Sequence, residues 1–179
     1  MSTITRETRE TRIRVAIIAD PGATSITTSI PFLDHMLSTL ARYARLGIII
    51  EAHGDLRHHI IEDVAICLGN AIADFAPPMC ARFGERTIPM DEALVQCALD
   101  FGGRAYYRGP LPSSLYDHWM RSFADNAAAT IHLRVLRGKD RHHVVEAAFK
   151  ALGLALSDAL RESDAVFSTK GAAVIRQET

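Results

Sequence analysis

The stretch GDLRHHIIEDVAICLGNAIADF at residues 54–75 recurs without gaps at residues 138–159 as GKDRHHVVEAAFKALGLALSDA. Nine aligned positions are identical, whereas about one or two would coincide by average composition. Two shorter motifs, DHM at 34–36 and DHW at 117–119, form a further pair upstream. The sequence therefore predicts a chain built from two copies of one structural half. The identical pairs are Gly54/Gly138, Arg57/Arg141, His58/His142, His59/His143, Glu62/Glu146, Leu68/Leu152, Gly69/Gly153, Ala71/Ala155 and Asp74/Asp158.

Each half carries the same order of predicted elements, namely strand, helix, strand and helix. β-branched residues favour strands, and Pro31 is typical of the first turn of a helix. In the first half, the predicted strands are 11–18 and 48–50. One predicted helix begins at Pro31, and the other spans 58–75. In the second half, the predicted strands are 92–100, 103–108 and 130–136, and the predicted helices are near 114–126 and at 142–160.

This order predicts an α+β fold made of two duplicated two-layer α/β lobes, with the helices packed against mixed sheets. We expect a single domain over residues 1–179, with lobes at about 10–78 and 90–162. The segment from Pro77 to Pro89 contains three prolines and Gly84, so it is the expected connector.

Composition excludes several classes of protein. Of the 179 residues 48% are hydrophobic and 23% are charged, which argues against disorder, and the formal net charge is −1. No global charge favours nucleic acid or a membrane surface, and no run of residues is long and apolar enough to span a bilayer. The N-terminus is charged throughout, and the three cysteines are odd in number and show no CxxC spacing. Both features indicate a cytoplasmic protein.

Six of the eight histidines lie in the repeated motifs. In HHxxE on a helix, each histidine can share a face with the glutamate, but neighbouring histidines point about 100° apart. Each histidine of a pair is therefore expected to serve a different ion. The set provides two sites of about four nitrogen and oxygen ligands each, which suits manganese, iron or zinc. The candidate ligands are His35, His58, His59, Glu62, His118, His142, His143 and Glu146, whereas His53 and His132 are expected to have no metal role.

The motifs PFLDHML (31–37), HHIIEDVAICLG (58–69), RFGERTIPMDEAL (82–94), HHVVEAAFKA (142–151) and FSTKG (167–171) follow one another in this order. In these motifs the chain resembles the imidazoleglycerol-phosphate dehydratase family of histidine biosynthesis, over nearly its whole length. The resemblance implies a manganese enzyme that removes water from imidazole glycerol phosphate to give imidazole acetol phosphate. It also implies metals at subunit contacts in a shell of 24 identical chains, and it selects the same eight ligands.

The resemblance assigns further roles. It makes Glu10 an acid/base that meets the departing hydroxyl, although by itself Glu10 is typical of a solvated surface charge. The hydrogen removed beside the imidazole ring is poorly acidic, so the ring must accept electrons, and two divalent Lewis acids favour the anionic ring. The family's phosphate-binding positions match Arg82, Arg104, Ser168, Thr169 and Lys170. Lys150, one turn after Glu146, could also reach the substrate.

The chain departs from the family pattern at a few positions. The lead into the first HHxxE motif is three residues shorter and lacks acidic residues that would orient metal-bound imidazoles. Tyr43 stands where a histidine is usual. Two alternatives therefore stay open: a divergent paralogue that acts on a related imidazole or triazole-like substrate, and a non-catalytic shell protein whose chains are bridged by metal.

Overall fold

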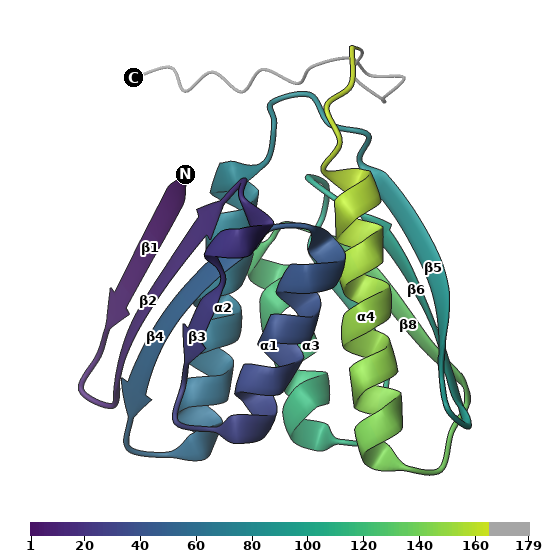
Figure 1. Ribbon diagram of the computed structural model, residues 1–179, viewed down its shortest axis with the longest axis horizontal. Helices are drawn as coiled ribbons and strands as arrows, with labels where there is room; N and C mark the ends of the chain where they lie inside the picture. The colour runs from purple at the N-terminus through teal and green to yellow at the C-terminus, as the bar shows by residue number, and fades with distance from the viewer. Residues whose placement is uncertain (165–179) are drawn as a thin grey trace, which may run out of the picture.

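The computed structural model describes residues 1–164, and its two halves repeat one order of elements (Figure 1). The first half contains β1 Ser2–Glu7, β2 Thr11–Ile18, the 3-10 turn η1 Pro21–Ala23, β3 Ser25–Thr27, α1 Pro31–Ala44, β4 Gly47–Gly54 and α2 Arg57–Phe75. The second half contains β5 Phe83–Met90, β6 Ala93–Asp100, β7 Tyr106–Arg108, α3 Ser114–Asn126, β8 Thr130–Arg137 and α4 Arg141–Ala159.

Each half forms a four-stranded mixed sheet of the same topology. The strand orders are β1-β2-β4-β3 and β5-β6-β8-β7. In each sheet the first three strands pair antiparallel, and the last strand pairs parallel to its neighbour. The helices lie between the two sheets (Figure 1). The prediction of an α+β fold with helices on mixed sheets is confirmed.

The predicted order of elements was incomplete. Each half begins with a hairpin and a short third strand, so the order is strand, strand, strand, helix, strand, helix. The segment 77–89, expected as a connector, contributes most of β5. Both overlooked first strands, β1 and β5, lie at sheet edges, and most of their residues are exposed or half-buried. An edge strand needs few apolar residues and tolerates a proline, so its sequence pattern is weak.

One hydrophobic core runs through both halves. Helix α1 packs against α4, and α2 packs against α3, so each helix packs against a helix of the other half. The rings of Trp119, Phe123 and Phe149 are fully buried in this core, where Trp119 stacks on Phe123 and meets Phe149 at a tilt of 42°. Cys67 and Cys97 are buried as free thiols. The duplicated halves therefore form one packed unit.

The repeated glycines lie where these helices cross. A Cβ at Gly69 would lie 2.8 Å from the carbonyl oxygen of Phe123 and 2.9 Å from the amide nitrogen of Ala127. At Gly153 the equivalent atom would lie 3.0 Å from the carbonyl oxygen of Leu40. Only glycine allows the helices to approach so closely.

Replacing Gly69 with alanine is expected to lower the free energy of unfolding by about 1–3 kcal/mol, because the new methyl group overlaps backbone atoms of α3. Urea unfolding of the metal-free protein measures the change. Asp74→Ala, at an exposed position of the same helix, is the control and should leave the unfolding curve nearly unchanged. An unchanged midpoint for Gly69→Ala would show that the crossing can open at little cost.

Candidate metal centre

The six histidines of the repeated motifs lie in the first two turns of the four helices. All four helices begin at the same end of the molecule, the lower edge in Figure 1. Two aspartates fix the helix starts to the preceding loops. Asp34 accepts a hydrogen bond from the Thr28 amide at 2.9 Å, and Asp117 accepts one from the Leu111 amide at 2.8 Å. The fold thus gathers the histidines at one end, which we call the metal end.

The first cluster contains His35 of α1 with His142 and Glu146 of α4. The Nε2 atoms of His35 and His142 lie 3.2 and 3.1 Å from Oε2 of Glu146. Glu146 is buried, and its other oxygen accepts from Lys150 Nζ at 2.9 Å. Burial alone would raise the pKa of Glu146, but the hydrogen bonds from Lys150 and His35 outweigh it and hold the pKa below its usual value. The carboxylate is therefore ionised and available as a ligand.

The second cluster contains His58 and Glu62 of α2 with His118 of α3. Nε2 of His58 lies 3.5 Å from Oε2 of Glu62, and Nε2 of His118 lies 3.2 Å from Oε1 of the same carboxylate. The His118 nitrogen is buried without a well-formed hydrogen bond to any group of residues 1–164. A buried imidazole nitrogen that lacks a partner is a good candidate for a metal ligand.

Each cluster combines the two halves of the chain: one half contributes the first histidine, and the other contributes the HHxxE histidine and glutamate. The ligand atoms of each cluster lie within 4.8 Å of one another. Two imidazoles and a carboxylate fit a divalent transition metal and leave positions open for further ligands. The donor set therefore fits the metal that the sequence predicted, and the repeat explains why there are two such clusters.

The second histidine of each HHxxE motif points away from these clusters. The rings of His58 and His59 are inclined by 74°, and those of His142 and His143 by 79°. His59 instead contacts Asp55, whose Oδ1 lies 2.8 Å from Nδ1. His143 contacts Glu92, whose Oε2 lies 2.7 Å from Nδ1. Of the four ligands predicted per site, the chain thus brings three together and holds the fourth apart.

These contacts shift the pKa of every group involved. The Asp55 hydrogen bond raises the pKa of His59, and the Glu92 hydrogen bond raises the pKa of His143. The hydrogen bond from the Asp140 amide has the largest effect on Glu92 and that from His143 the next largest, and together they lower its pKa to about 2. The hydrogen bond from His59 likewise lowers the pKa of Asp55. Both carboxylates are thus ionised at neutral pH and accept a hydrogen bond from Nδ1.

Neither orienting carboxylate was predicted from the sequence. Asp55 lies four residues before His59, on the turn that leads into α2. Glu92 belongs to the β5–β6 hairpin, 51 residues from His143. Glu92 directly precedes β6, just as Glu10 directly precedes β2. This equivalence is the sequence signal that could have identified Glu92.

Glu10 also lies at the metal end, in the β1–β2 hairpin. Its carboxylate is exposed, and Oε2 lies 3.6 Å from Nδ1 of His59. The buried Asp63 of α2 fixes this hairpin by accepting hydrogen bonds from Arg6 Nε at 2.9 Å and from the Thr11 hydroxyl. The position of Glu10 thus depends on a helix residue that directly follows the candidate ligand Glu62.

Replacing Asp63 with alanine is expected to lower the free energy of unfolding by about 1–3 kcal/mol, because the buried Thr11 hydroxyl loses its acceptor. Urea unfolding with metal removed gives the value. Glu7→Ala, which breaks only the exposed pair with Arg12, serves as the control and should behave like the parent protein. Equal stability of both variants would contradict the role assigned to Asp63.

Arg82 and Arg104, the predicted phosphate-binding arginines, lie at the end of the molecule opposite the metal end. The Arg82 amide donates to the carbonyl of Ala159, the last residue of α4, at 2.8 Å. Since α4 rises roughly 25 Å from His142 to Ala159, Arg82 is far from the metal end of its own chain. Arg104 precedes β7, and its carbonyl accepts from Thr130, where β8 begins. Ser168, Thr169 and Lys170 lie outside the described residues.

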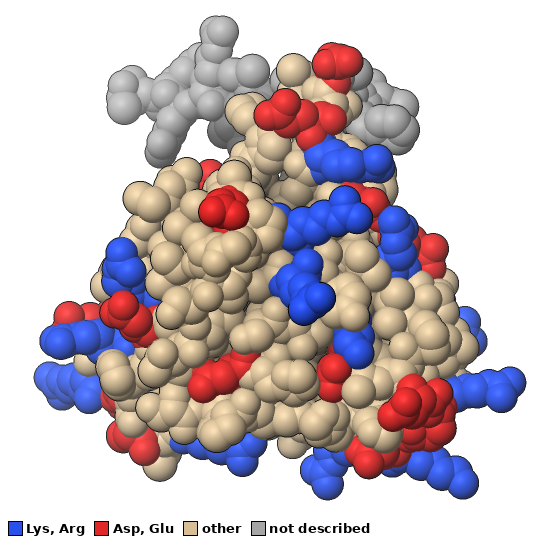
Figure 2. All heavy atoms as spheres, viewed as in Figure 1, with Lys and Arg blue, Asp and Glu red and all other residues tan. Residues whose placement is uncertain are grey.

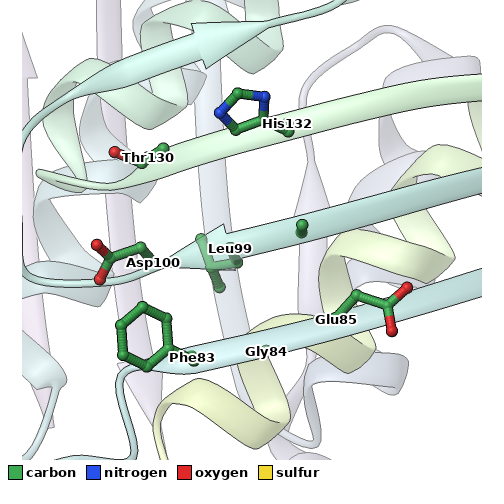
Figure 3. A pocket seen from close by; sticks show the side chains of 8 residues that line it. Phe83, Gly84, Glu85, Leu99, Asp100, Thr130 and His132 are labelled. Carbon is green, nitrogen blue, oxygen red and sulfur yellow. The ribbon is translucent and has the colours of Figure 1, made fainter. Parts of the chain in front are cut away.

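Arg82 forms an ion pair with Asp100, whose Oδ1 lies 2.5 Å from Nε. Asp100 also borders a surface pocket of about 360 Å³ on the second sheet, together with Phe83, Leu99 and His132 (Figure 3). Among residues 1–164, its lining includes none of the candidate metal ligands and neither Arg82 nor Arg104. It adjoins the predicted phosphate-binding arginines, because Asp100 pairs with Arg82 and Thr130 donates to the carbonyl of Arg104.

Charges on the face seen in Figure 2 are mixed, with basic and acidic side chains interspersed. This distribution agrees with the net charge of −1 and leaves anion binding to local groups. Within residues 1–164, no helix has the length and apolar character needed to cross a membrane.

The fold and the paired clusters define a duplicated α+β protein with two equivalent candidate metal sites built from histidine and glutamate. The family model for imidazoleglycerol-phosphate dehydratase (IGPD) matches residues 28–156. The chain belongs to the imidazoleglycerol-phosphate dehydratase family.

Known relatives agree over almost their full length. The imidazoleglycerol-phosphate dehydratase of Pyrobaculum calidifontis is 45% identical, with 93% of this chain and 96% of the relative covered. That of Chlorobium phaeovibrioides is 41% identical, with 95% and 94% covered. The crystal structure of IGPD from Pyrococcus furiosus superposes with a TM-score of 0.87 at 40% identity, covering 95% of this chain and 100% of that one. The enzyme from Staphylococcus aureus gives 0.80 at 31% identity, covering 91% and 100%.

Proposed function

We propose that the protein is a hydro-lyase that removes water from imidazole glycerol phosphate to give imidazole acetol phosphate in histidine biosynthesis. The observation that carries this proposal is the pair of equivalent histidine and glutamate clusters in a chain of this family. Two clusters suit a substrate ring with two nitrogen atoms, since each nitrogen can approach one metal.

We propose that each cluster holds one divalent ion, manganese in the first place, with iron or zinc as alternatives. His35, His142 and Glu146 would hold one ion, and His58, Glu62 and His118 the other. When bound, the ions supply Lewis acidity that favours the anionic imidazole ring. His59 and His143 would complete the coordination of ions in neighbouring chains, because within their own chain they belong to neither cluster and contact Asp55 and Glu92 instead.

Residues of the chain would then move the protons. Glu10 is assigned as the acid/base that protonates the departing hydroxyl, since its exposed carboxylate lies at the metal end and is held only loosely by His59. Lys150 is assigned to the substrate, and its position beside Glu146 and above the Tyr43 ring places it next to the first cluster. Tyr43, where a histidine is usual, thus borders this region without displacing a metal ligand.

We propose that a complete site requires neighbouring chains, as in a shell of 24 copies in the cytoplasm. Arg82 and Arg104, assigned to the substrate phosphate with Ser168, Thr169 and Lys170, lie at the opposite end from the clusters of their own chain. Phosphate and imidazole of one small substrate cannot span that distance. A second copy must therefore bring its arginine end to the metal end of the first.

The function is tested with purified protein that has been stripped of metal and reloaded with Mn²⁺. It should convert imidazole glycerol phosphate to a ketone product, and the stripped protein should not. Loaded protein without turnover would refute the assignment and favour either a paralogue with a related substrate or a non-catalytic shell bridged by metal. Complementation of a strain that lacks this dehydratase provides an independent test.

Arg104→Ala separates the enzyme from the shell protein. If Arg104 binds the phosphate, KM should rise about 10- to 100-fold, as expected for the loss of a hydrogen bond between charged groups, while the size of the assembly stays the same. Steady-state kinetics and light scattering measure the two quantities. Arg108→Ala, at an exposed position of β7, is the control. An unchanged KM would remove Arg104 from the site.

A further inference from the structure

Glu10 and Glu92 occupy equivalent places in the two halves. Glu10 lies in the β1–β2 hairpin directly before β2, and Glu92 lies in the β5–β6 hairpin directly before β6. Both hairpins reach the metal end, at the lower edge of Figure 1. Each touches the turn before the following HHxxE helix: the Glu10 carbonyl accepts from the Asp55 amide at 3.0 Å, and the Glu92 carboxylate accepts from the Asp140 amide at 2.8 Å.

The side chains of the two glutamates are engaged differently. Both oxygens of Glu92 are committed, Oε2 to His143 Nδ1 at 2.7 Å and Oε1 to the amides of Lys139 and Asp140. The carboxylate of Glu10 lies 3.6 Å from the equivalent nitrogen of His59, which is too long for a hydrogen bond.

The reason for this difference lies four residues before each histidine. In the first half this position is Asp55, whose Oδ1 lies 2.8 Å from His59 Nδ1. In the second half it is Lys139, whose ammonium group cannot accept a hydrogen bond. Each histidine therefore has one carboxylate at Nδ1, but the carboxylates come from different elements.

A carboxylate at Nδ1 has a defined effect on an imidazole. It retains the proton on Nδ1, so the lone pair is on Nε2, and it fixes the direction in which Nε2 points. In both clusters it is the Nε2 atoms that face the glutamates. His59 and His143 would therefore present the same nitrogen to a metal as the other four histidines.

We infer that the duplicated hairpin glutamates have divided their roles: Glu92 is a positioning residue that orients His143 for metal binding, and Asp55 orients His59, which leaves the Glu10 carboxylate available for proton transfer. This inference rests on the proposed function in taking His59 and His143 as metal ligands. It explains why, beside two equivalent clusters, one of the two equivalent hairpin glutamates is committed to a histidine and the other is not.

Glu92→Gln tests the orienting role without removing the side chain. The amide oxygen can still accept from the Lys139 and Asp140 amides, but its NH₂ group then faces His143 Nδ1 and favours the tautomer that carries the proton on Nε2. In that tautomer Nε2 has no lone pair for a metal. We expect Mn²⁺ affinity to fall about 10- to 100-fold, the usual cost of losing such a partner, while folding is retained.

The measurement is a titration of the metal-stripped full-length chain with Mn²⁺, followed by the electron paramagnetic resonance signal of the free ion. Asp55→Asn should weaken binding to a similar degree through His59. Glu10→Gln should leave the affinity unchanged, and Glu7→Gln in the same hairpin is the matched control. Urea unfolding of each stripped variant reports on folding, and ¹⁵N chemical shifts of labelled histidines report the tautomer.

Parent-like Mn²⁺ affinity in a folded Glu92→Gln variant would overturn the orienting role. A loss of affinity in Glu10→Gln as large as that in Glu92→Gln would overturn the division of roles. Since no substrate is present, these results are independent of turnover: a parent protein that binds Mn²⁺ tightly but catalyses no dehydration refutes the proposed function alone. A parent protein that binds no Mn²⁺ refutes both.

Discussion

Glu10→Gln is expected to lower kcat by about 10²- to 10⁴-fold, the usual contribution of a positioned acid/base. Glutamine fills nearly the same volume but cannot give up or take a proton at the pH of the reaction. Glu10 belongs to neither of the two clusters proposed to hold the ions, His35/His142/Glu146 and His58/Glu62/His118, and lies instead beside Asp55 and His59, so the variant should retain its full metal content. Steady-state turnover of the Mn²⁺-loaded variant and elemental analysis of the same sample measure both quantities.

Glu7→Gln is the matched control, since Glu7 is an exposed glutamate of the same hairpin and its carboxylate pairs with the exposed Arg12. Its kcat should equal that of the parent protein. Two results would contradict the assignment of Glu10. One is turnover within about threefold of the parent, well below the usual acid/base effect. The other is a loss of bound metal that by itself explains the loss of activity.

The repeat in the sequence predicted much of the fold because helices with buried faces have strong periodic patterns. The central strands and all four helices were predicted, with the helix over 58–75 beginning only one residue late. The edge strands β1 and β5 were missed because their solvent-facing residues show no apolar alternation. Pro77 and Pro89 suggested a connector, whereas an edge strand accommodates Pro89 near its end.

The composition of each cluster could not be read from the sequence. The repeat suggested that each half provides a half-site, but His35 joins Glu146, 111 residues away, rather than Glu62 of its own half. That pairing results from the packing of α1 on α4 and of α2 on α3. Helix packing across the duplication is a property of the tertiary structure, and no local spacing encodes it.

The separation of the two ends was also not evident. In the sequence Arg82 lies 20 residues from Glu62, but α2 carries the chain from the metal end to the opposite end before Arg82 is reached. A helix of 19 residues spans roughly 28 Å, so the intervening distance is fixed by the helix itself. If both groups bind one substrate, as proposed, contacts between chains, which are not encoded in any local motif, would join them.

Glu146→Gln is the second change with a large expected effect. Glu146 is the buried carboxylate that His35, His142 and Lys150 share, and an amide in its place is a poor ligand that provides no negative charge. We expect metal content after dialysis to fall from two ions per chain to about one, since affinity at this cluster should drop at least about 100-fold. Activity should be lost with that ion, because one Lewis acid can stabilise only one ring nitrogen.

Glu62→Gln makes the same change in the other cluster and should give the same stoichiometry, since the clusters are equivalent by the repeat. Glu51→Gln, at an exposed position of β4, is the control and should retain two ions and full turnover. Inductively coupled plasma mass spectrometry on dialysed samples gives the count. Two retained ions in Glu146→Gln would exclude this carboxylate as a ligand. The loss of both ions would instead show that the two clusters bind metal cooperatively and not independently.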